Sequence, residues 1–413
     1  MRGHQETDEA GRADGGGAAP RHGRTRDRRD RVVRGALLLI VACVVTGVAS
    51  AAALALHWDD NITRVDESDL LADDRERPAA TVPDPEDPDA GAPVNLLLLG
   101  SDARDGRNGE IGGTFAGRRS DVAIVLHVSA DRSRVELVSI PRDSMVEIPR
   151  CRVTGGGSTS ASSYAQFNKA FAWGWDAGHD LVSAASCAMT TVEHLTDVRL
   201  DGFAAVDFAG FVDMVDAMDG VPVCIPRDLD DAKAKLHLAA GTHVLDGAQA
   251  IALSRARHDL SDGSDTYRMG RQQALLAAMT TKVLHGGVLT DPPRLIRLVD
   301  AVTSSLTLSK DVDPVGLAYA LRSVRGEDVT FVTTPSGPDP RNGARVVWTD
   351  DAERLWERVA ADEPIVTTGE RPADGTGSAH APSDDPVTAS DGDPFDDRRP
   401  GVAITSADTR AAC

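Results

Sequence analysis

The chain has 413 residues, of which 41% are hydrophobic, so it is long enough for a sizeable core and is not disordered as a whole. Its formal net charge is −20 at pH 7. Residues 59–92 hold twelve acidic residues against three arginines, residues 362–413 hold eleven against four, and residues 1–34 hold nine arginines against six acidic residues. The acidity therefore belongs mainly to two Pro-, Asp- and Gly-rich stretches of a kind typical of solvated, disordered segments.

A membrane anchor is predicted near the N-terminus. Residues 35–56 contain no charge, and these 22 residues are as many as a helix needs to cross a bilayer. The basic segment 1–34 precedes them, so the positive-inside rule keeps that segment in the cytoplasm and places the remainder outside the cell. A cleaved signal peptide is the alternative, because "ASAAALA" offers small residues, but the long apolar run and the long basic lead favour an uncleaved anchor.

The composition divides the chain after the anchor into three parts. Residues 57–92 are expected to be an acidic disordered linker, and residues 362–413 a disordered acidic tail. Residues 93–361 lie between them and carry the regular hydrophobic patterns. We therefore expect one extracytoplasmic domain over 93–361.

Strands and helices alternate within that domain. "VNLLLLGSD" predicts a buried strand that delivers Asp102 to a loop, and a hairpin is expected from Asp121 to Val128 and from Val135 to Ile140. Helices are expected at "DLVSAASCAMTTVEHLT", over 207–218, from Asp246, from Ser264 or Asp265, and over 292–305, 311–322 and 350–359, with a strand at "DVTFVTTP". The pattern predicts the α/β class: a single mixed-sheet domain with surrounding helices, preceded by one transmembrane helix.

The cysteines fit an exported domain. Cys151, Cys187 and Cys224 lie within 93–361, where a disulfide can persist in an oxidising compartment. Cys151 with Cys187 is the preferred pair because both flank one loop-rich segment, although the spacing leaves the connectivity open. The sequence has no CxxC motif and no His-rich cluster, so no zinc site is expected.

Carboxylates and arginines gather at the ends of the predicted elements. Asp102 and Asp121 each stand at a strand boundary, and two aspartates with water and phosphate oxygens are an ordinary way to hold Mg²⁺. Guanidinium groups suit bidentate contacts with phosphate, and the candidates are Arg119, Arg142, Arg255, Arg257 and Arg268. Taken singly, each aspartate could be a turn former and each arginine a solvated surface residue. Together they indicate phosphoryl transfer, and no GxSxG or GxxxxGK[ST] motif supports another mechanism.

At these positions the chain resembles the LytR-CpsA-Psr family, and its Ala, Gly, Arg and Asp usage points to the actinobacterial type. The motifs run in order from about residue 93 to 335 and are "NLLLLGSDARDG", "RRSDVAIVLHV", "VSIPRDS", "FNKAFAWG", "AGFVDMVDAMDGV", "LDGAQAIALSRARH" and "GSDTYRMGRQQ". The resemblance implies a membrane-anchored transferase that moves a glycopolymer from a polyprenyl diphosphate carrier to the C6 hydroxyl of N-acetylmuramic acid in peptidoglycan. Polyprenyl phosphate would be released. A polyprenyl diphosphate hydrolase and a non-catalytic receptor for anionic polymer or lipid are the alternatives.

The resemblance also assigns roles to single residues. It implies that Asp102 and Asp121 bind Mg²⁺, or alternatively Mn²⁺, and that these two, with Arg142 and Arg255, are the catalytic residues. The implied diphosphate-binding residues are Arg119, Arg142, Arg255, Arg257, Arg268 and Gln272, with Asp265 and Asn168 in support.

One position departs from the family pattern. Gln166 stands where the family often has a lysine, and Lys169 follows three residues later, so a neutral donor replaces a charge. The implied partners are the lipid-linked donor, peptidoglycan and the membrane. Nucleic acid is not expected, because the 34 residues before the anchor show no DNA-binding pattern.

Overall fold

The computed structural model describes residues 23–72, 77–80, 91–101, 108, 120–225, 228–232, 234–256, 265–365, 401 and 403–405. Within this set, the side chains of 265–269, of residue 404 and of part of the first helix lie outside the description. The chain divides into two units, Met1–His57 and Trp58–Cys413.

Helix α1 (Gly23–Asn61) makes up the described part of the first unit and continues into the first residues of the second. Its stretch Leu37–Asn61 contains an 18-residue window with a mean hydropathy of 2.6, and α1 is the one helix among the described residues that is long and apolar enough to cross a membrane. The predicted apolar helix therefore exists, with a C-terminal end five residues beyond the predicted Leu56.

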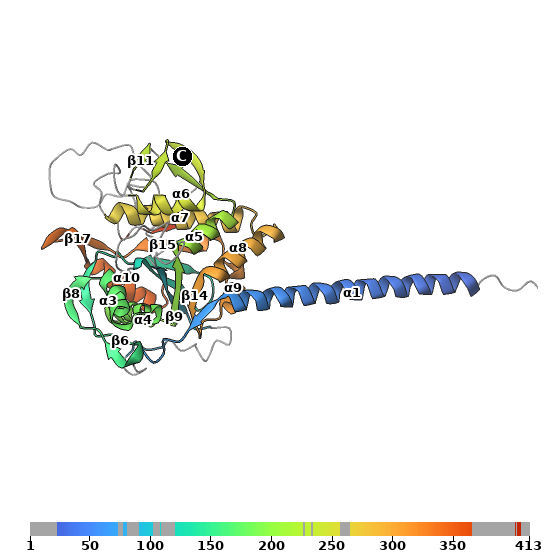
Figure 1. The fold of residues 1–413 in the computed structure, drawn as a ribbon, viewed down its shortest axis with the longest axis horizontal. Coiled ribbons are helices and arrows are strands. Elements are labelled where there is room, and N and C mark those ends of the chain that lie inside the picture. Colours follow the sequence, from blue (N-terminus) through green and yellow to red (C-terminus); the bar gives the residue numbers. More distant parts are fainter. Residues whose placement is uncertain are drawn as a thin grey trace, which may run out of the picture. The chain divides into compact units, whose positions relative to one another are not determined.

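The second unit is built on a mixed sheet of eight strands in the order β1-β14-β9-β2-β3-β4-β15-β18 (Figure 1). Its strands are β1 (Thr63–Val65), β2 (Val94–Ser101), β3 (Ser120–Val128), β4 (Val135–Ser139), β9 (Gly202–Asp207), β14 (Leu306–Ser309), β15 (Val329–Thr333) and β18 (Ile404–Thr405). The pairs β1–β14, β2–β9 and β4–β15 are parallel and the other four are antiparallel. The predicted mixed-sheet α/β domain is confirmed.

Helices cover both faces of this sheet, as the near-continuous apolar run of β2 requires. Side chains of β2, β3, β4 and β9 pack on one face against α3, α4 and α10, and Val128 and Phe331 pack on the other against Ala277 of α7. Figure 1 shows α5, α6, α7 and α8 on that second side. The helices are α3 (Asn168–Gly178), α4 (Leu181–Thr196), α5 (Phe208–Ala217), α6 (Gly247–Arg255), α7 (Asp265–His285), α8 (Pro292–Ser305), α9 (Pro314–Ala320) and α10 (Asp350–Ala360).

Five of these helices begin after an aspartate that accepts a hydrogen bond from the first-turn backbone, which satisfies one of the unpaired N–H groups there. The capping residues are Asp180, Asp207, Asp246, Asp291 and Asp313. Asp246 and Gln249 complete a reciprocal capping box at the start of α6, the helix start predicted from the sequence.

Smaller two-stranded sheets surround the central one. They are β5 (Met145–Ile148) with β8 (Ser162–Gln166), β6 (Arg152–Val153) with β7 (Gly157–Ser158), β10 (Val221–Ile225) with β13 (Gly241–Leu245), β11 (Leu229–Asp231) with β12 (Leu236–Leu238), and β16 (Ser336–Asp339) with β17 (Asn342–Trp348). Cys151 and Cys187 form a disulfide with a Cα–Cα distance of 5.1 Å, which ties the β5–β6 connection to α4. This is the pair that the sequence favoured.

Two predicted segments differ from the structure. The expected linker 57–92 contains β1, and Ile62 and Leu71 from the same segment are buried. The expected tail 362–413 contributes β18 to the sheet, and Asp362 accepts hydrogen bonds from the backbone N–H of Ala130 and from Arg134. The domain therefore extends beyond 93–361 at both ends, because a few apolar or hydrogen-bonding residues suffice to dock a segment whose average composition is acidic.

Candidate phosphate-binding site

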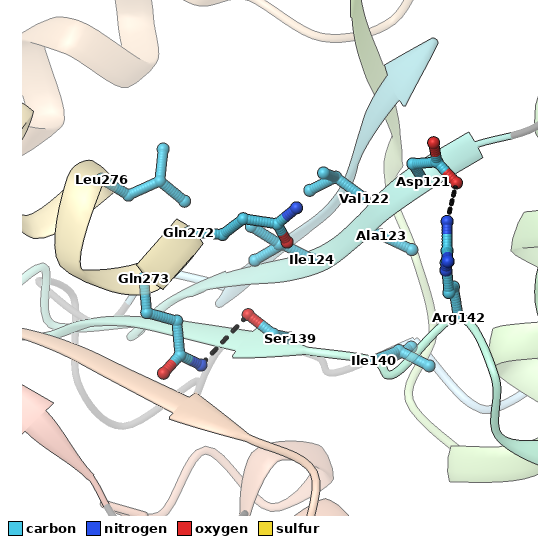
Figure 2. A pocket seen from close by; sticks show the side chains of 10 residues that line it. All are labelled: Asp121, Val122, Ala123, Ile124, Ser139, Ile140, Arg142, Gln272, Gln273 and Leu276. Carbon is cyan, nitrogen blue, oxygen red and sulfur yellow. Dashed lines mark hydrogen bonds and ion pairs between the residues drawn. The ribbon is translucent and has the colours of Figure 1, made fainter. Parts of the chain in front are cut away.

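The β3–β4 hairpin brings Asp121 and Arg142 together. Ile124 of β3 is paired with Ser139 of β4. Because the strands are antiparallel, Asp121, three residues before Ile124, and Arg142, three residues after Ser139, lie at the same end of the hairpin. Arg142 Nη1 donates to Asp121 Oδ1 over 2.5 Å (Figure 2). The side chains are 33% exposed for Asp121 and 16% for Arg142, so the pair lies at the surface with the guanidinium largely covered.

A small cavity lies beside this pair, between the hairpin and α7 (Figure 2). It is lined by Asp121, Val122, Ala123, Ile124, Ser139, Ile140, Arg142, Gln272, Gln273 and Leu276. Its volume is about 10 Å³, which is room for about one water molecule and not for a lipid chain. A large ligand would therefore contact this site from outside the cavity, through the partly exposed Asp121 side chain and its partner Arg142.

Two glutamines of α7 hold the far wall of the cavity. Gln273 Nε2 donates to Thr333 Oγ1 over 2.7 Å and to Ser139 Oγ over 3.3 Å, so this buried amide ties α7 to β15 and β4. Gln272 Nε2 donates to the carbonyl oxygen of Ser254 over 3.2 Å. Gln272, a predicted site residue, thus lines the same cavity as Asp121 and Arg142 and links it to the end of α6.

Asp143 stands directly behind Arg142. Its Oδ2 lies 3.5 Å from Arg142 Nε, and its Oδ1 accepts a 2.8 Å hydrogen bond from Arg345 Nη1 of β17. Gln166 Nε2 donates to that same Oδ1. Asp143 and Arg345 were not predicted from the sequence; the "PRD" motif places Asp143 beside Arg142, but nothing local signals a partner 202 residues away.

Asn108 lies between β2 and β3 in the sequence and is bonded to the start of α5. Its Nδ2 donates to Asp207 Oδ2 over 2.7 Å, and its Oδ1 accepts from the backbone N–H of Ala209 over 2.7 Å. Asn108 is buried, and its two hydrogen bonds hold it at the first turn of α5. The sequence offered no signal for it, because an isolated asparagine in a glycine-rich stretch is typical of a turn.

The other predicted residues fall into three groups. Arg255 is exposed at the end of α6 with its guanidinium 5.3 Å from the centroid of the Phe208 ring, and it is not among the cavity-lining residues. Asn168 is buried at the start of α3, and its backbone N–H donates to the carbonyl oxygen of Arg142. Asp102, Arg119 and Arg257 lie outside the described residues, as do the side chains of Asp265 and Arg268, whose backbone belongs to α7.

The described residues of the site supply only some of the oxygen ligands that a hard cation such as Mg²⁺ needs. Asp121 is a partly exposed carboxylate, the kind of ligand that Mg²⁺ combines with water and phosphate oxygens. Within the described ranges, no group of three or more His, Cys, Asp and Glu side chains is arranged to hold a metal ion by itself. A cation here would accordingly depend on Asp121 together with ligands from a substrate or from residues outside the described set.

Comparison with known proteins identifies a family and several relatives. Residues 59–360 match the model of the LytR_cpsA_psr family. The chain is 31% identical over 262 residues to the cell wall biosynthesis protein LcpA of Corynebacterium glutamicum, a match that covers 60% of this chain and 50% of LcpA. The chain thus spans half the length of that relative.

Two further proteins illustrate the range of similarity. The polyisoprenyl-teichoic acid–peptidoglycan teichoic acid transferase TagT of Bacillus subtilis is 32% identical over 246 residues, covering 58% of this chain and 67% of TagT. Among solved structures, a LytR-Csp2A-Psr enzyme from Actinomyces oris is 22% identical with a TM-score of 0.50, covering 72% of this chain and 96% of that one. At that identity the likeness concerns the fold alone.

Proposed function

Because the chain belongs to the LytR-CpsA-Psr family, we propose that it is a membrane-anchored phosphotransferase that attaches a cell-wall glycopolymer to peptidoglycan. The donor is the glycopolymer on a polyprenyl diphosphate carrier, and the acceptor is the C6 hydroxyl of N-acetylmuramic acid. The family membership and the transferase name of TagT support the class of reaction. The single observation in this chain that carries the proposal is the Asp121–Arg142 pair that lines the cavity.

The proposed reaction breaks one bond and forms one. The acceptor oxygen attacks the phosphorus next to the glycopolymer, a new phosphodiester forms, and the bond from that phosphorus to the bridging oxygen breaks to release polyprenyl phosphate. The hydroxyl proton must leave the acceptor. Among the described residues that line the cavity, the Asp121 carboxylate is the group that can accept this proton. Negative charge grows on the bridging oxygen, so a fixed cation nearby lowers the barrier.

Among the described residues, Arg142 has the cationic side chain suited to that role. Its guanidinium is planar and permanently charged, and its Nη1 is held by Asp121, so its orientation is set before substrate arrives. A guanidinium that is mostly covered interacts more strongly with phosphate than one in open water. Arg255, at the end of α6, is the second described arginine we assign to the diphosphate, and Gln272 joins its neighbour Ser254 to the cavity.

A divalent cation completes the proposal. Asp121, with Asp102, which lies outside the described residues, would hold Mg²⁺, or alternatively Mn²⁺. When bound, such an ion supplies charge neutralisation to the diphosphate oxygens.

The location of the enzyme is also part of the proposal. We place α1 across the cell membrane with the N-terminus in the cytoplasm, and the domain from Trp58 onward outside the cell. The Cys151–Cys187 disulfide supports this placement, because disulfides persist in oxidising compartments.

The test uses the full chain reconstituted in lipid vesicles, with a polyprenyl diphosphate-linked glycan and peptidoglycan oligomers, and mass spectrometry of the products. Ligated product that depends on Mg²⁺ is the expected result. Polyprenyl phosphate without ligation would assign hydrolysis instead, and unchanged lipid bound to the protein would assign a receptor.

The residue-level test compares Asp121→Asn and Arg142→Gln with Arg354→Gln. Arg354 lies on α10 with 65% of its side chain exposed, so its substitution controls for the loss of one surface arginine. We expect each site variant to lose at least about 100-fold in rate while the control keeps the original rate. Equal rates for all three variants would remove Asp121 and Arg142 from the site.

A further inference from the structure

Asp143 is a buried carboxylate shared by two arginines. Its side chain is 10% exposed, and a carboxylate so far removed from water is stable only when cations or hydrogen-bond donors compensate for the lost hydration. Oδ2 faces Arg142 Nε at 3.5 Å, whereas Oδ1 accepts from Arg345 Nη1 at 2.8 Å and from Gln166. The closer of the two cations is therefore Arg345.

Arg142 in turn lies between two carboxylates. Its Nη1 donates to Asp121 over 2.5 Å, and its Nε lies 3.5 Å from Asp143. Asp121 and Asp143 thus compete for one guanidinium, and the distances show that Asp121 has the closer contact. Arg345 contacts Asp143 from the other side, and a second positive charge there weakens the attraction between Asp143 and Arg142.

The β16–β17 hairpin that carries Arg345 is docked on this segment of the chain. Trp348 Nε1 donates to Ser144 Oγ over 3.0 Å, and the backbone N–H of Val346 donates to the carbonyl oxygen of Asp143 over 3.4 Å. Ser144 and Val346 also form an isolated parallel bridge. Arg345 therefore reaches Asp143 from a strand that is itself fixed beside the site.

We propose that Asp143 and Arg345 are positioning residues that hold the Arg142 guanidinium toward Asp121, and that Arg345 supplies the charge that the neutral Gln166 does not. The proposal rests on the proposed transfer reaction for its kinetic consequence. Without Arg345, Asp143 keeps only an amide on Oδ1 and draws the Arg142 guanidinium toward itself, away from Asp121 and from an incoming phosphate. Gln166 and Arg345 donate to the same oxygen, so a lysine at 166 can replace the missing charge.

The experiment measures transfer kinetics and the affinity for inorganic pyrophosphate with the full chain in vesicles or detergent. The variants are Arg345→Gln, Arg345→Lys and the double variant Gln166→Lys/Arg345→Gln. Arg341→Gln is the matched control, because Arg341 belongs to the same hairpin but lies over the Tyr164 ring at 4.4 Å.

Arg345→Gln is expected to lower kcat and weaken pyrophosphate binding by about tenfold each, the scale on which a misplaced catalytic group acts. Arg345→Lys and the double variant should recover at least half of both losses, and Arg341→Gln should match the unchanged chain. A merely structural role for Arg345 would lower the melting temperature but leave kcat and pyrophosphate affinity of the folded protein unchanged.

The outcomes separate this inference from the proposed function. In one outcome, the protein ligates no product, yet its pyrophosphate binding weakens in Arg345→Gln and recovers in the double variant. That result would contradict the transfer proposal and support the positioning role. Equal kcat and equal pyrophosphate affinity in Arg345→Gln and the unchanged chain overturn the positioning role. If Arg345→Gln fails to fold, a folded double variant that remains as weak as Arg142→Gln overturns it too.

Discussion

Removal of the Cys151–Cys187 disulfide should destabilise the domain by a calculable amount. The two cysteines are 36 residues apart, and closing a loop of that length in the unfolded chain corresponds to about 3.8 kcal/mol at 25 °C on the chain-entropy model. Both residues are buried in the core beneath the central sheet, so replacing them by alanine also removes packed sulfur atoms. For a domain of about 300 residues, a loss of that size lowers the melting temperature by about 6 °C.

The assay is urea unfolding of the full chain in detergent, followed by tryptophan fluorescence, because Trp356 is buried against the same core. The Cys151→Ala/Cys187→Ala variant is compared with Cys43→Ala, which removes the exposed, unpaired cysteine among the described residues. The control should unfold at the original urea concentration. A loss of less than about 1 kcal/mol in the double variant would refute the loop-entropy reasoning.

Two predictions concern the two ends of the central sheet. His127 is fully buried between Asn95 and Asp362, and burial lowers its pKa below the ordinary 6.5. The unfolded chain therefore takes up a proton near pH 6.5 that the folded chain binds only at lower pH, so the free energy of unfolding should fall as the pH falls from 7.5 to 5.5. His127→Gln should flatten that slope in urea titrations, even though the raised pKa of buried Glu136 acts in the opposite direction in both proteins; identical slopes would contradict the assignment. At the other end, Gln273→Leu leaves the hydroxyls of Ser139 and Thr333 without their amide partner and should destabilise the domain by about 1–3 kcal/mol, whereas an unchanged melting temperature would show that these hydrogen bonds contribute nothing.

Local patterns in the sequence were enough for most of the sheet and helices. The apolar run at 94–99 and the two halves of the 120–139 hairpin are strands, and Asp246 begins a helix, because these features depend on residues close together in the chain. The predicted strand ends also presented Asp121 and Arg142. Antiparallel pairing brings the start of β3 and the end of β4 together, so this part of the site follows from the hairpin.

The remainder depends on contacts that span the chain. Asp143 and Arg345 are 202 residues apart, and Arg77 and Glu193, which form a buried ion pair, are 116 apart, so neither pairing leaves a local pattern. The acidic composition of 57–92 predicted a disordered linker and gave no sign of the three-residue strand β1. This strand docks on β14 through backbone hydrogen bonds, which do not depend on the composition of the segment. The average composition of a segment therefore does not predict whether a short part of its backbone pairs with a sheet.

The short strand β18 covers one edge of the central sheet. Its Thr405 and Ile404 pair with Thr330 and Phe331 of β15, and the backbone N–H of Gly401 donates to the carbonyl oxygen of Thr333. Without β18, the backbone N–H and C=O groups on that side of β15 would be unpaired, and an unpaired strand edge is a template for pairing with another chain. A chain shortened before residue 401 should therefore associate with itself more readily.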